Sequence, residues 1–207
     1  EGEYVALLDH DDLLEEHALF EIVKWLQNHP ETDMVYTDED KVTFDSKIYF
    51  KPHFKPDFNR ELLRSNNYIC HLLTVKKDLL MEAGLYKEEF DGAQDYDLIL
   101  RCSEKAKQIG HIPQVLYHWR SHTASTAANP GSKSYAYEAG RKAVEAHLKR
   151  MGEDAVVEPM DNPGFYRVNY RVHGNAKVSI VLMNVTSLKD LRRIIRAVSR
   201  HRSYGNF

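Results

Sequence analysis

The chain has 207 residues, of which 43% are hydrophobic, and its formal net charge is −3. This size and composition suit one soluble globular domain, or one domain with part of another. The near-neutral charge argues against a dedicated nucleic-acid binder, which carries a clustered basic excess, and no apolar run approaches the ~20 residues that span a bilayer.

Predicted strands and helices alternate along most of the chain, which indicates an α/β domain. Residues 5–8 form a continuous apolar run, typical of a strand buried in a parallel sheet. Asp12 is expected to cap the next helix, with Glu15 completing a capping box, and that helix ends near Pro30. The following elements are expected to be strands at 33–40 and 68–75, a short helix closed by Gly84, a helix at 95–108, a strand from 111 and a helix at 135–150.

The character of the chain changes after Gly152. Residues 153–176 contain proline, glycine and short strand-like pieces, which indicates a connector. A fresh apolar strand at 177–183 and an arginine-rich helix at 188–201 follow. The predicted division is therefore 1–152, 153–176 and 177–207.

Two carboxylates stand directly after the first strand. Asp9 and Asp11 are two residues apart, with His10 between them. Ligands of open α/β sheets bind at the carboxyl ends of strands, so both acids can face one cation or one sugar-phosphate. Hard divalent ions such as Mg²⁺ or Mn²⁺ suit such oxygen ligands. The alternative is that Asp11 and Asp12 only favour the positive end of the next helix.

Further polar residues lie at strand and helix ends. Asp95, at the start of a helix, is either a cap or a general base that faces a cleft. His118, Arg120 and His122 stand at a strand-to-loop transition, where imidazole and guanidinium groups can bind metal and diphosphate, or can be ordinary surface residues. The stretch "YTDEDKV" supplies Asp38, Glu39 and Asp40, which either add acids to such a site or stand in a solvated turn. Asn67 and His71 suit either hydroxyl recognition or backbone capping.

Taken together and in this order, the segments "LLDHDD", "YTDEDK", "FKPDFNRELLRSNNYICH", "FDGAQDYDLILR" and "HWRSHTAST" resemble the bacterial glycosyltransferase family 2 proteins that build surface polysaccharides. The resemblance covers about residues 1–152 and is strongest to multi-domain members with rhamnosyltransferase-like modules. It implies a GT-A-like, Rossmann-related mixed sheet flanked by helices. The family's N-terminal nucleotide-binding half is missing from the match.

The resemblance also implies a role for each matching residue. Asp95 matches the catalytic base, and Asp9 and Arg120 match groups that bind the donor and its phosphates. Asp11 and His122 match metal ligands. The weaker acceptor-side candidates are Gln94, Asn67 and His71.

The implied reaction is an inverting, metal-dependent transfer from a nucleotide-diphosphate sugar to a glycan or lipid-linked glycan acceptor, without nucleic acid as a partner. The implied location is the cytoplasm, and peripheral membrane association through the parent protein stays open. Residues 177–207 resemble the first strand–helix unit of a following, truncated glycosyltransferase domain, so the chain is expected to be a fragment with weak or no activity alone. The alternatives are a non-catalytic glycan-binding or assembly module and a metal-dependent nucleotidyltransferase.

Overall fold

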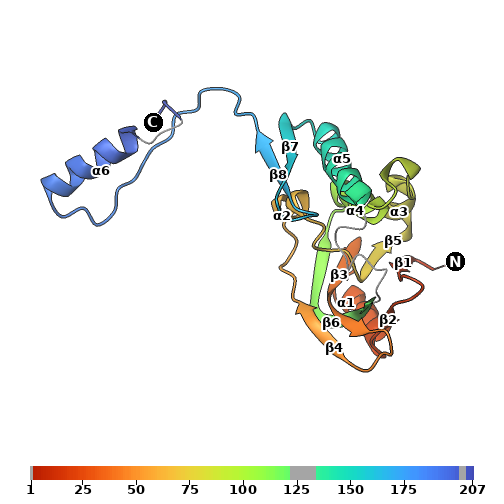
Figure 1. The fold of residues 1–207 in the computed structure, drawn as a ribbon. Coiled ribbons are helices and arrows are strands. Elements are labelled where there is room, and N and C mark those ends of the chain that lie inside the picture. The colour runs from red at the N-terminus through yellow and green to blue at the C-terminus, as the bar shows by residue number, and fades with distance from the viewer. Residues whose placement is uncertain (1, 122–133, 201–203) are drawn as a thin grey trace. The chain divides into compact units, whose positions relative to one another are not determined.

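The computed structural model describes residues 2–121, 134–200 and 204–207. The chain divides into two compact units, Glu1–Tyr170 and Arg171–Phe207. The first unit contains a six-stranded sheet with the order β1-β5-β3-β6-β2, and β4 pairs with β3 (Figure 1). Its strands are β1 (Tyr4–Leu7), β2 (Leu13–Leu14), β3 (Met34–Thr43), β4 (Tyr49–His53), β5 (Leu73–Lys76) and β6 (Ile109–Ser121).

Helices cover both faces of this sheet, and β3 supplies apolar side chains to each face. Met34 and Tyr36 belong to the larger core, which the helices α2 to α5 share, whereas Val35 belongs to a second core under α1. Successive strand residues point to opposite faces, so one apolar strand serves both layers. The helices of this unit are α1 (Ala18–Asn28), α2 (Arg60–Ser65), α3 (Lys77–Ala83), the 3-10 helix η1 (Glu88–Phe90), α4 (Gln94–Lys105) and α5 (Ser134–Arg150).

The sheet is mixed. The central pair β3 and β6 is parallel, whereas β3 pairs antiparallel with both β4 and β5. The predicted α/β class, a mixed sheet flanked by helices, is confirmed.

β1 differs from the prediction of a strand buried in a parallel sheet. It pairs antiparallel with β5, where Val5 lies opposite Val75, and it stands at one end of the strand order. Its apolar residues Val5 and Leu7 are only half-buried. A strand at the end of the order has one neighbour in the sheet, so its residues keep partial exposure.

The predicted strand at 68–75 is mostly a buried turn, because β5 begins only at Leu73. Cys70 has a φ of 34°, outside the extended region, so the ladder cannot run through it. Tyr68 and Ile69 are nevertheless buried in the larger core. The apolar run therefore reports burial of these residues, and not a continuous strand.

A hairpin of β7 (Ala155–Pro159) and β8 (Tyr166–Tyr170) falls within the predicted connector. The hairpin packs on the first unit, since Tyr166 lies in the larger core and its hydroxyl donates to the carbonyl of Tyr137 at 2.8 Å. Figure 1 shows it beside α5 and α2. The first unit thus extends to Tyr170, while the division into domains at 152 and 176 stays a prediction.

The second unit contains the predicted helix, α6 (Leu188–Arg200). Residues 177–183, predicted to be a buried strand, have no regular secondary structure, and Ile180 is 47% exposed. The predicted strand is therefore wrong. None of the helices in the described ranges has the length and apolar character that a membrane span requires. The assignment of this unit to a following domain stays a prediction.

Candidate functional site

The three consecutive acids of β3 are paired with histidines. Asp38 and Glu39 are 2% and 8% exposed, so the expectation of a solvated turn is wrong. Their partners are His111 for Asp38 at 2.8 Å, His71 for Glu39 at 3.2 Å and His118 for Asp40 at 2.6 Å. Buried carboxylates need such partners, because an isolated charge away from water is costly.

Lys55, from the stretch that joins β4 to α2, places a buried ammonium beside these acids. Its side chain is 0% exposed, and Nζ donates to Glu39 Oε2 at 3.2 Å. Nζ also donates to the carbonyl of Ile69 at 2.7 Å and to that of His71. The three protons of the ammonium are thus satisfied. Burial lowers the pKa of Lys55, and the charge of Glu39 opposes this shift.

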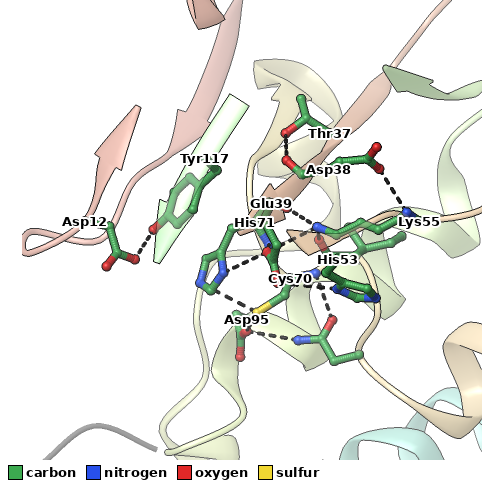
Figure 2. A network of polar contacts seen from close by, with 12 residues as sticks. Asp12, Thr37, Asp38, Glu39, His53, Lys55, Cys70, His71, Asp95 and Tyr117 are labelled. Carbon is green, nitrogen blue, oxygen red and sulfur yellow. Dashed lines mark hydrogen bonds and ion pairs between the residues drawn. The ribbon is translucent and has the colours of Figure 1, made fainter. Parts of the chain in front are cut away.

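His71 lies between two carboxylates. Its Nδ1 is 3.2 Å from Glu39 Oε2, and its Nε2 is 3.8 Å from Asp9 Oδ2. The ring stacks on Tyr117 with centroids 4.5 Å apart (Figure 2). Burial by itself would lower the pKa of His71, but the interactions with Cys70, Asp9 and Glu39 raise it well above its ordinary value. The structure therefore favours an imidazolium at this point.

The neighbouring carboxylates shift in the opposite direction. Burial would raise the pKa of Glu39, but the hydrogen bonds of His53 and His71 and the charge of Lys55 lower it. The hydrogen bond with His71 likewise lowers the pKa of Asp9. Both acids are therefore held in the ionised form.

Asp95, in the first turn of α4, joins the same group of side chains. Its Oδ2 accepts from Asn67 Nδ2 at 3.0 Å and from Cys70 Sγ at 3.8 Å. The Cys70 sulfur lies 3.6 Å from Nε2 of His71. A continuous series of polar contacts therefore runs from Asp9 through His71 and Cys70 to Asp95, and Figure 2 shows the part of it around His71, Cys70 and Asp95.

Asp12 does not cap a helix, contrary to the prediction. The N-cap position of α1 is His17, and the carboxylate of Asp12 is buried against β6. Oδ1 accepts from the backbone N–H of Arg120 at 2.8 Å, and Oδ2 accepts from the Tyr117 hydroxyl. Burial raises the pKa of Asp12. The Asp12 carboxylate is bound by two hydrogen-bond donors on β6 and not by backbone N–H groups of a helix. The helix α1 therefore begins later than predicted, at Ala18.

Each of the other predicted site residues has its own surroundings. The Arg120 guanidinium donates to the carbonyls of Asp11 and Phe44, which ties the loop after β1 to the turn between β3 and β4. Gln94 accepts from the backbone N–H of Gly92 at 2.9 Å, close to its own helix end. Asp11 is half-buried. The predicted metal ligand His122 lies outside the described residues.

A group that can hold a metal ion lies beside this series. Asp9, Asp12 and His71 each offer one ligand atom, and these atoms lie within 4.8 Å of one another. Two carboxylate oxygens and one imidazole nitrogen fit a divalent cation. Glu39 on Nδ1 of His71 leaves Nε2 for the metal side, as in many metal centres. Binding would require His71 to release its proton, so metal and proton compete for Nε2.

Lys55 and Glu39 were missed as site-positioning residues by the sequence reasoning. Both stand in segments that the family resemblance quotes, "FKPDF" and "YTDEDK". The sequence offered one signal of a buried ion pair, namely that Lys55 stands between apolar residues while acids occur elsewhere in the chain. It could not identify the partner, because Lys55 and Glu39 are 16 residues apart and meet only through the β3–β4 hairpin.

No family model matches the chain. The chain is 44% identical over 209 residues to the uncharacterized protein y4gI of Sinorhizobium fredii, covering 100% of the chain and 23% of that protein. It is 39% identical over 208 residues to the O-antigen biosynthesis protein RfbC of Myxococcus xanthus, covering 100% of the chain and 16% of RfbC. It is 28% identical over 128 residues to a chondroitin synthase of Pasteurella multocida, covering 61% of the chain and 13% of that protein.

The chain thus spans less than a quarter of the length of each of these three relatives. Among solved structures, it resembles that of Staphylococcus aureus TarS 1–349 with a TM-score of 0.46 and 12% identity, covering 83% of this chain and 73% of that chain.

Replacement of Lys55 by methionine is expected to lower the free energy of unfolding by ~3–5 kcal/mol, because Glu39 and two carbonyl groups lose a buried donor. Lys24→Met is the matched control. Lys24 pairs with Glu21 at 3.1 Å on the exposed face of α1, where such a pair contributes ~0–1 kcal/mol. Urea unfolding of both variants makes the comparison. Equal losses in the two variants would show that the buried ammonium is not a major support of the fold.

His71 is expected to make stability depend on pH. Its folded-state pKa is raised, so its contribution is present below the unfolded value of ~6.5 and is lost as the pH rises through the folded value. Urea unfolding with a metal chelator present should show the largest difference between wild type and His71→Gln at the acidic end. An NMR titration of the ring provides the direct check, and Glu39→Gln should lower the observed pKa. Titration of His71 at or below ~6.5 would contradict the assignment.

Proposed function

We propose that this chain is mainly the C-terminal part of a glycosyltransferase domain that builds bacterial surface polysaccharide. The observation that carries the proposal is the contact series that joins Asp9, from the acidic stretch after the first strand, to Asp95 at the start of α4. The names of two relatives, an O-antigen biosynthesis protein and a chondroitin synthase, support polysaccharide synthesis as the process.

In the proposed reaction, Asp95 removes the proton of an acceptor hydroxyl while that oxygen attacks the anomeric carbon of the donor sugar. The new carbon–oxygen bond forms as the bond to the diphosphate breaks, and the diphosphate leaves with the electron pair. A single displacement inverts the configuration at the anomeric carbon and needs no covalent enzyme intermediate. A well-placed general base contributes ~10²–10⁴-fold to the rate.

The donor end of the proposed site is the loop after β1. Asp9 is exposed there with its carboxylate ionised, whereas Asp12 is buried and holds the loop on β6. Asp9, Asp12 and His71 are the groups that would hold a divalent cation, with Asp11 as the ligand that the family resemblance implies. When bound, such a cation neutralises charge on the departing diphosphate.

The inverting course, the family 2 assignment, a nucleotide-diphosphate sugar as donor and a glycan or lipid-linked glycan as acceptor are all parts of the same proposal. A cytoplasmic location also belongs to it. Arg120 is proposed to act on the donor mainly by fixing the loop that carries Asp11, because its guanidinium donates to the carbonyl of that residue.

Asp95→Asn in the complete protein is expected to reduce sugar transfer ~10²–10⁴-fold, because the amide cannot accept the hydroxyl proton. The affinity for the donor sugar, measured by calorimetry with a panel of nucleotide sugars, should stay unchanged. Asp91→Asn is the matched control, since Asp91 is an exposed acid in the turn just before α4. Undiminished transfer by Asp95→Asn would refute the proposed role, and no transfer by the wild type would favour a non-catalytic module.

Mn²⁺ is expected to bind this chain, and Asp9→Asn and His71→Gln should each weaken binding by at least ~10–100-fold, the loss that follows removal of a residue that only supports a metal ligand. Affinity should fall as the pH is lowered, since Nε2 of His71 must lose its proton. Calorimetry with MnCl₂ tests both points, with the exposed Glu16→Gln as control. Unchanged affinity in both variants, together with loss of binding in Asp11→Asn, would instead favour the ligands that the sequence predicts.

A further inference from the structure

Among the described residues, the hydrogen-bond donors to the Asp95 carboxylate reach one of its two oxygens. Both of its hydrogen-bond donors, Asn67 Nδ2 at 3.0 Å and Cys70 Sγ at 3.8 Å, point at the same oxygen, Oδ2. Oδ1 accepts no hydrogen bond from the part of the chain that the structure describes. A carboxylate has two equivalent oxygens when it is free to rotate, so donors that select one of them also select the direction of the other.

We propose that Asn67 and Cys70 are positioning residues that hold Oδ2 of Asp95 so that Oδ1 faces the acceptor hydroxyl. This inference rests on the proposed function, in which Asp95 is the base. It also revises the role of Asn67, which was expected to contact the acceptor. Its amide N–H is instead directed at the base.

The two donors are set by their own turn before any substrate binds. The backbone N–H of Cys70 donates to Asn67 Oδ1 at 3.4 Å, which orients the amide so that Nδ2 faces Asp95. The carbonyls of Ile69 and His71, on either side of Cys70, are both held by the ammonium of Lys55. A buried ion therefore fixes the turn that presents these donors, and such preorganisation avoids an ordering cost during reaction.

The backbone of Asp95 is fixed from the other side by α4. Asp97, two residues further along, is fully buried and pairs with Arg101 at 2.7 Å. Arg101 in turn donates to the carbonyls of Ala83, Gly84 and Leu85, at the end of α3. The helix that carries the base is thus anchored independently of the turn that orients its carboxylate.

Cys70 has a second contact, which links the base to the donor end. A carboxylate can only accept, so the thiol donates to Asp95, while its sulfur, 3.6 Å from Nε2 of His71, can accept from that nitrogen when it carries a proton and holds no cation. His71 also faces Asp9. We therefore expect that loss of the thiol changes the position of Asp95 relative to the donor sugar. A serine keeps an O–H group that can donate to Asp95, so it should preserve that position.

The test uses the complete protein and separates kcat from KM. Asn67→Asp is nearly isosteric but replaces the donor by a second carboxylate, which repels Asp95. It should lower kcat at least about 10- to 100-fold, the loss expected for one hydrogen bond to a charged group. KM for the donor sugar should stay within about 2-fold. Cys70→Ala should lower kcat about 10-fold. The conservative Cys70→Ser should recover most of that loss.

A double variant distinguishes positioning from a general structural role. If Asn67 acts through Asp95, then Asn67→Asp added to Asp95→Asn should cause no further loss of transfer. An additional loss equal to that of the single variant would overturn the inference. Transfer by Asn67→Asp and Cys70→Ala at the wild-type rate would also overturn it, provided that Asp95→Asn is inactive. Full activity of Asp95→Asn would instead overturn the proposed function itself.

NMR provides a readout that needs no turnover. The side-chain amide protons of Asn67 should shift between wild type and Asp95→Ala, because the amide loses its carboxylate partner. The matched control Asp91→Ala should leave those signals in place. Unchanged Asn67 amide signals in Asp95→Ala would contradict the contact on which the inference depends.

Discussion

A buried ammonium organises this protein. The side chain of Lys55 is removed from water, and its charge is compensated by Glu39 on β3 and by two carbonyls of the turn before β5. A charge in such a place is tolerated only when its partners are all in position, because an uncompensated buried ion is costly. The strand and the turn must therefore come together in one arrangement. This requirement gives residues 69–71 a conformation that a β-ladder would not provide.

That requirement extends outward to the candidate site. The turn held by Lys55 carries Asn67, Cys70 and His71, which contact the carboxylates of Asp95 and Asp9. Hydrogen bonds in a buried network strengthen one another and limit the geometries available to their members. The buried ion pair of Lys55 and Glu39 thus fixes the positions of the side chains in the candidate site. The side chains that would meet a substrate lie at the exposed end of the network.

The acidic stretch after β1 is divided between structure and chemistry. Asp12 points inward, where Tyr117 and the backbone of Arg120 hold it, whereas the Asp9 side chain is 67% exposed. The inward residue fixes the loop on β6 and adds one oxygen to the group that can hold a metal ion, and the outward one is left available for a ligand. Two aspartates three positions apart in the sequence therefore have different environments and different pKa shifts. A motif of acids does not by itself say which acid does the chemistry.

The sequence by itself determined most of the alternation of helices and strands, and with it the α/β class, because periodicity and end signals are local. The mixed sheet followed only from the resemblance to a known family, and the acids Asp38 to Asp40 lie within β3 rather than at its end. The apolar runs at 68–72 and 177–183 were wrongly predicted to be strands, since an apolar run can equally be a buried turn or a segment outside the sheet. Only the tertiary structure decided that Glu39 is buried against Lys55, that Asp12 contacts β6 and caps no helix, and that the Asn67 amide donates to Asp95. The physical reason is that the protonation and orientation of a charged side chain depend on which distant groups replace its water, and the chain must fold before those groups are next to it.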